Sequence, residues 1–300
     1  SNVYVMVIPY AFQRTGLTAD ELLDAWSRKV SRMGVYDYWS IPDWTDDLPD
    51  FDPYEFGPER IRGWERRGID GFLVESTCSS GAMGLGWLIA SRLAWETSGD
   101  VSSIEEEFLT RAFGAGKTPM KRMFRRWSLG FCLTSHELGL SYRDLEEACR
   151  LTEGEEGSRS RILDFGRYVE YLRRRYEYGQ EELSSTEIRG AAAERLMRTM
   201  WRMYDSSMIH AFRLSQLLIR DEANLKNPEL GTKYDWMNSS APVWKEIHPF
   251  EDGEVLSLIH AGVNDFSPRG FEARRYQGDP VRLPNDRVGS RTETDGGFSD

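Results

Sequence analysis

The segment RMGVYDYWSIPDW, residues 32–44, decides how the first third of the chain is interpreted. It places a short apolar run directly before Tyr36, Asp37, Tyr38 and Trp39. We predict that GVYDYW forms a β-strand whose end carries these rings and the carboxylate. Such a strand end either packs under the Asp- and Pro-rich loop that follows or faces a ligand, and the sequence leaves both interpretations open.

Two more apolar segments are typical of strands. VYVMVIPY, residues 3–10, is a continuous apolar run, as expected for a strand that is buried on both faces. The helix pattern TADELLDAWSRKV follows it, and Thr18 and Glu21 form a capping box at its start. IDGFLVES, residues 69–76, is the third predicted strand. Helix patterns separate these strands, and the alternation predicts a parallel sheet with crossover helices.

The pattern changes at about residue 100. From there to about residue 221 we find amphipathic helix patterns and no convincing strand. Beyond Phe271 the chain becomes polar and rich in Gly and Pro. We therefore expect a partial (β/α) barrel over residues 1–99, a helical domain over residues 100–271, and a polar tail over residues 272–300.

The predicted fold class is α/β followed by all-α. A closed (β/α)8 barrel needs eight strands and about 250 residues, so three strands cannot close one. We expect residues 1–99 to be the last strands of a (β/α)8-type barrel whose opening strands are not in this sequence. A small open α/β sheet with a helical cap is the alternative, and length alone does not separate the two.

Composition excludes several classes of protein. The formal net charge of −11 disfavours nucleic acid as a partner. The sequence contains no run of about eighteen apolar residues, so it predicts no membrane span. The three cysteines and four histidines show neither a disulfide framework nor a metal-ligand spacing, so we expect no metal and no organic cofactor. The compartment stays open: cytoplasmic, or extracellular or periplasmic if a signal peptide has been removed.

The ends of the predicted strands carry the candidate site. In parallel α/β folds, ligands bind at the carboxyl ends of the strands. Aromatic rings stack on the apolar face of a sugar, and carboxylates serve as acid, base or nucleophile in glycoside hydrolysis. We therefore predict Glu75 and Asp37 as the catalytic pair. The predicted substrate-binding residues are Tyr10, Tyr36, Tyr38 and Trp39.

Structural interpretations compete with these roles. Asp37 could equally cap the next loop or pair with an arginine. A glutamate that ends an apolar strand, such as Glu75, is costly unless it is paired or functional, which favours function. Tyr38 and Trp39 could equally pack beneath the following loop.

The stretch from GIDGFLVESTCSSG through LAWETSGDV to FLTRAFGAGKTPMKRMFRRW, residues 68–127, resembles a bacterial family called domain of unknown function 4838, which occurs in glycoside-hydrolase-like proteins. GVYDYW, RILDFGRYVEYLRRR and MWRMYDSSMIHAFRL also suit that family, and the resemblance covers about residues 3–271. It implies a barrel distantly similar to that of α-glucuronidases, followed by an all-helical region. Only Asp37 and Glu75 match it as candidate acids.

The sequence thus predicts a carbohydrate-active protein, a glycoside hydrolase that acts on an oligosaccharide or polysaccharide through paired carboxylates. One alternative is a carbohydrate-binding protein without catalysis. Another is a helical protein-interaction module on a barrel scaffold, which requires a large apolar face on the helices between Ser158 and Asp221.

Overall fold

The computed structural model describes residues 3–9, 15–38, 47–49, 53–54, 56–75, 78–181, 185–238, 240 and 243–266. All of them belong to one compact unit, Ser1–Ser267. The predicted tail, residues 272–300, lies outside the described residues. The predicted boundary at residue 99 stays a prediction.

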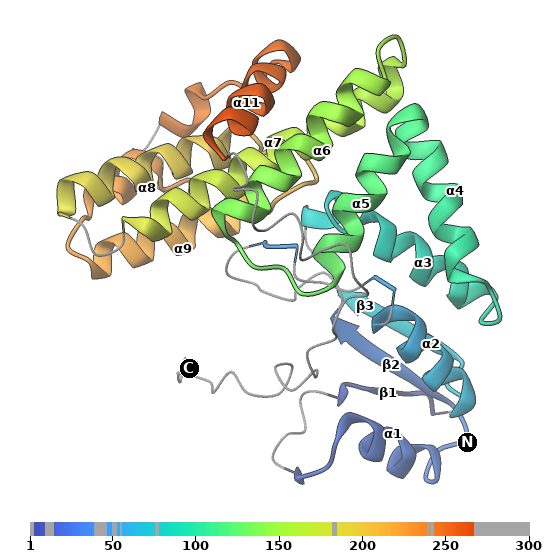
Figure 1. Cartoon of the computed structure of the whole chain (residues 1–300). Helices are drawn as coiled ribbons and strands as arrows, with labels where there is room; N and C mark the ends of the chain where they lie inside the picture. Colours follow the sequence, from blue (N-terminus) through green and yellow to red (C-terminus); the bar gives the residue numbers. More distant parts are fainter. Residues whose placement is uncertain are drawn as a thin grey trace. The chain divides into compact units, whose positions relative to one another are not determined.

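The first part of the unit contains a parallel sheet of three strands in the order β1-β2-β3 (Figure 1). The strands are β1 (Val5–Val7), β2 (Met33–Tyr38) and β3 (Gly71–Glu75), close to the predicted segments. Two helices connect them, α1 (Ala19–Ser27) and α2 (Phe56–Arg66). The predicted capping box is present, because the Thr18 side chain accepts from the Glu21 N–H and the Glu21 carboxylate accepts from the Thr18 N–H.

The predicted barrel is wrong. After β3, the described residues form helices and no further strand, so the described chain is mainly helical with a small α/β start. In the sheet that they form, β1 and β3 are edge strands, whereas a barrel pairs every edge. The physical reason is that the described segments after β3 form helices that bury their apolar sides largely against one another.

One face of the sheet is covered by α1 and α2. Right-handed crossovers between neighbouring parallel strands place both helices on the same side. Arg67, just after α2, confirms this, because its guanidinium bonds the carboxylates of Asp24 (2.7 Å) and Asp20 (3.1 Å) of α1. Val7 and Val35 are register partners and therefore share a face, and both are buried.

The opposite face is more open. Met6 and Leu73 belong to it and are 40% and 54% exposed. Gly34 and Gly71 are register partners on this face, near the starts of β2 and β3. A Cβ added to either would lie within 3 Å of the Tyr4 hydroxyl oxygen, so both positions require glycine for the tyrosine to lie across them.

The remaining helices pack as successive neighbours, with α6 against α7, α7 against α8 and α8 against α9 (Figure 1). Aromatic rings of α4, α5 and α7 form a shared core, in which Phe165 contacts Phe113 and Phe124 at ring distances of 5.8 and 5.2 Å. None of the described helices combines the length and the apolar character that crossing a membrane requires. The bounds are α3 Gly84–Trp95, α4 Val101–Phe113, α5 Lys117–Ser128, α6 Ser135–Leu151, α7 Glu156–Gln180, α8 Thr186–Trp201, α9 Ala211–Asn224, α10 Glu229–Tyr234 and α11 Asp252–Asp265, with 3-10 turns η2 Cys78–Gly81, η3 Gly114–Gly116 and η4 Val243–Glu246.

Candidate functional site

The carboxyl ends of β2 and β3 lie side by side. Tyr38 and Glu75 are register partners and are the last residues of their strands. The backbone therefore brings an aromatic and an acidic position together at the carboxyl ends of these two strands. The side chains of Tyr38 and Glu75, and the whole of Tyr10 and Trp39, lie outside the described residues.

Asp37 has a structural partner. Its carboxylate forms an ion pair with the Arg60 guanidinium of α2, and its residue is only 6% exposed. Removing a carboxylate from water is costly unless a cation and hydrogen bonds compensate it, and Arg60 provides that compensation. The contact joins the end of β2 to the helix that covers it, which agrees with the arginine-pair interpretation of Asp37.

The pleat of the sheet separates the two acidic positions. Successive residues of a strand alternate between its faces, so position 37 shares the helix-covered face with Val35. Position 75 is in register with position 38 and belongs to the other face, together with Leu73. Tyr36, the register partner of Leu73, also belongs to that face and is half-buried. The catalytic pairing of Asp37 with Glu75 stays a prediction.

Two residues from the helical part of the chain form hydrogen bonds with Asp47, in the segment that follows β2. The Tyr168 hydroxyl of α7 donates to the Asp47 carbonyl at 2.6 Å, and the His210 N–H donates to the Asp47 carboxylate at 2.6 Å. Burial, with Asp47 nearby, holds the pKa of Tyr168 well above its usual value, so this hydroxyl remains a neutral donor.

A second contact fixes the turn after β3. The Gly81 N–H donates to the Ser207 carbonyl at 2.6 Å, and a Cβ at Gly81 would lie 2.8 Å from the same oxygen. Sequence reasoning missed both contacts. The only local signal was the glycine-rich stretch after β3, since Asp47, Tyr168 and Ser207 are far apart along the chain.

Among the residues described, no three His, Cys, Asp or Glu side chains gather as the ligands of a metal ion. Comparison of the chain with models of known families, with curated proteins and with solved structures finds no match in any of the three. The resemblance to domain of unknown function 4838 therefore stays a prediction.

Proposed function

We propose that the chain is a carbohydrate-active protein that contacts an oligosaccharide or polysaccharide at the carboxyl edge of its sheet. The observation that carries the proposal is the register pairing of Tyr38 with Glu75 at the ends of two parallel strands. An aromatic ring and a carboxylate are the two groups that bind the apolar face and the hydroxyls of a sugar. Parallel sheets bind ligands at this edge.

The proposed reaction is hydrolysis of a glycosidic bond, with Glu75 as the acid, base or nucleophile. In the paired-carboxylate form of the proposal, Asp37 is the second acid. The Arg60 ion pair and the position of Asp37 on the helix-covered face favour a different role, in which Asp37 is a positioning residue that fixes the strand end carrying Tyr38.

Carbohydrate binding without catalysis is the second candidate function. It is favoured by the burial and ion pairing of Asp37, since a second acid is needed for either common hydrolytic mechanism. The two candidates share the same saccharide contact and differ only in turnover.

The interaction-module alternative has less support. Between Ser158 and Asp221, the large apolar side chains that are exposed among the described residues are Ile188 and Tyr204. They are 52% and 45% exposed and lie sixteen positions apart. A docking helix needs a contiguous apolar face, and two separate side chains do not form one.

The test begins with calorimetry and hydrolysis assays of the wild-type protein on a panel of aryl glycosides and oligosaccharides. Glu75→Gln should lower turnover at least about 100-fold, the scale of general acid–base catalysis, and leave saccharide binding measurable. Tyr38→Ala should weaken binding by about 0.5–1.5 kcal/mol, the scale of a ring contact. Glu153→Gln, an exposed residue in the turn after α6, is the matched control.

The outcomes separate the roles. Binding without turnover in the wild-type protein would select the second candidate function, and no binding to any saccharide would refute both. If Asp37 is a positioning residue, Asp37→Asn and Arg60→Met should lower the melting temperature together. A loss of turnover in Asp37→Asn alone, with the melting temperatures of both variants unchanged, would assign Asp37 to catalysis instead.

A further inference from the structure

The open face of the sheet, which α1 and α2 do not cover, has accessible apolar side chains. Met6 and Leu73 are 40% and 54% exposed, and Tyr4 on the same face is 39% exposed. Parallel sheets normally have both faces covered by other parts of the protein. Accessible apolar surface on one face of such a sheet therefore indicates a surface that binds something.

Polar groups lie at both ends of the open face. At its carboxyl end are positions 38 and 75, the proposed saccharide contact. At its amino end, the Asp70 carboxylate accepts from the Tyr4 hydroxyl and, at 3.3 Å, from Arg32 Nε. The side chains of Arg32 and Asp70 are 65% and 42% exposed, so both can form further hydrogen bonds with a ligand.

We propose that the open face binds an extended oligosaccharide, which runs from positions 38 and 75 to the Arg32–Asp70 ion pair. This inference rests on the proposed function and adds the length of the substrate and a second anchoring point. Position 70 precedes position 75 by five residues, so the two ends of the face are about 16 Å apart at about 3.3 Å per residue. A single sugar ring is too short to contact both ends, so the substrate is a chain of several sugars.

The side chains of the open face match a sugar chain better than a protein. Met6, Leu73 and the Tyr4 ring offer apolar surface to the C–H faces of sugar rings. The Arg32–Asp70 pair offers donors and acceptors to sugar hydroxyls. A stable protein interface takes about 20–30 residues on each side, and this face is much smaller.

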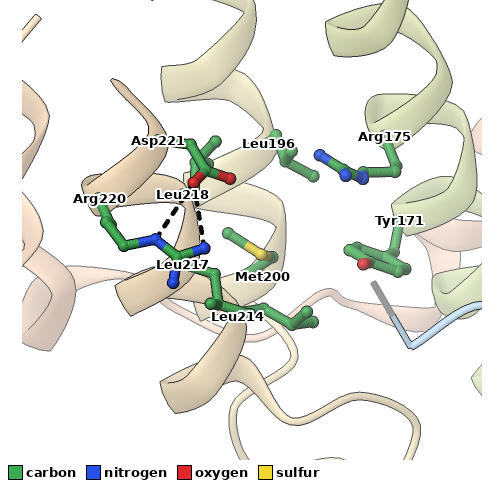
Figure 2. Close-up of a pocket in the computed structure, with 9 residues that line it drawn as sticks. All are labelled: Tyr171, Arg175, Leu196, Met200, Leu214, Leu217, Leu218, Arg220 and Asp221. Carbon is green, nitrogen blue, oxygen red and sulfur yellow. Dashed lines mark hydrogen bonds and ion pairs between the residues drawn. The ribbon is translucent and has the colours of Figure 1, made fainter. Parts of the chain in front are cut away.

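The hollow of about 250 Å³ among α7, α8 and α9 is not a second place for such a chain (Figure 2). Its apolar lining residues, such as Leu196 and Met200, are almost fully buried. Its mouth carries the Asp221 carboxylate next to Arg220. A sugar ring needs accessible surface, and the open face of the sheet provides more of it.

Calorimetry of the wild-type protein with cello-, xylo-, malto- and chito-oligosaccharides of increasing length tests the proposal. In a series that binds, the affinity should rise with length until the chain reaches the Arg32–Asp70 pair, and then stay constant. Equal affinity at every length would overturn the inference and leave the proposed function intact, because binding would then be confined to the carboxyl edge. No binding in any series would refute both.

Two variants test the second anchoring point. Arg32→Gln and Asp70→Asn should each weaken the longest oligosaccharide about 2- to 10-fold, the scale of one hydrogen bond, and leave the shortest unchanged. Arg150→Gln, at an exposed position of α6, is the matched control and should bind every length as the wild type does. Equal losses for short and long oligosaccharides, or wild-type affinity for the longest in both variants, would overturn the inference, with folding confirmed by circular dichroism.

Discussion

The converging ends of α7, α8 and α9 depend on one carboxylate that water does not reach. Glu222 of α9 is fully buried. It accepts hydrogen bonds from the Tyr178 hydroxyl at 2.7 Å, from Arg189 Nε at 3.1 Å and from Asn227 Nδ2 at 2.7 Å. These donors come from α7, from α8 and from the segment after α9. A change at Glu222 therefore affects all three attachments at once.

Glu222→Ala should be strongly destabilising. It leaves the Arg189 guanidinium, whose side chain is 7% exposed, buried without its carboxylate. Removing one partner of a buried ion pair costs about 3–5 kcal/mol. For a folded unit of this size, each kcal/mol lowers the melting temperature by about 2–4 °C, so the expected fall is about 6–20 °C.

Urea unfolding followed by tryptophan fluorescence, together with a thermal melt, measures this change. The midpoint should fall while the slope against urea stays constant. Glu153→Gln should change stability by less than about 0.5 kcal/mol, because its side chain is exposed. In a double-mutant cycle, Arg189→Met combined with Glu222→Leu should cost less than the sum of the single changes. Full additivity, or a loss below about 1 kcal/mol for Glu222→Ala, would refute the network as a stabilising element.

Two further predictions concern a pH dependence and a glycine. Burial alone would raise the pKa of Glu105, but hydrogen bonds from Arg125, Tyr54 and Lys121 lower it on balance. The stabilising contribution of Glu105 is therefore present above the ordinary glutamate pKa and is lost as pH falls through the lower pKa of the folded state. Glu105→Gln should flatten the acid limb of a plot of unfolding free energy against pH. An unchanged acid limb would contradict this. Gly262→Ala should cost about 1–3 kcal/mol in urea unfolding, because its Cβ would lie 2.4 Å from the buried ring of Tyr142. Gly179→Ala, with open space around it on α7, should be neutral or stabilising, and equal losses in the two glycine variants would refute the steric argument.

Local patterns predicted the elements of this chain well. The strand at Gly71–Glu75 and the capping box at Thr18 follow from residues that are close in sequence, so the information is local. The barrel could not be predicted in the same way. Whether a strand has a neighbour on each edge depends on distant parts of the chain, and an apolar strand has the same pattern in a barrel and in an open sheet.

The contacts around the candidate site show the same limit. Asp47 receives hydrogen bonds from Tyr168 and His210, which are more than a hundred residues away along the chain. No spacing rule relates positions so far apart. The burial of Tyr168 makes this contact specific, because its hydroxyl has to find an acceptor inside the protein.

Position 37 shows what is missing from the rule that ligands bind at the carboxyl ends of parallel strands. Acidic residues at the ends of parallel strands share an edge, but the pleat assigns each to one of two faces. The continuous run GVYDYW hides this assignment, because every residue of it is apolar or aromatic except the glycine and the aspartate. Once Val35 is placed in the core, Asp37 must share its face and needs a cation from the covering helix, and Arg60 stands one position before the buried Ile61 in that helix. A carboxylate at a strand end is therefore a strong catalytic candidate only when its parity places it away from the covering helices. By that criterion position 75 is a better candidate than position 37.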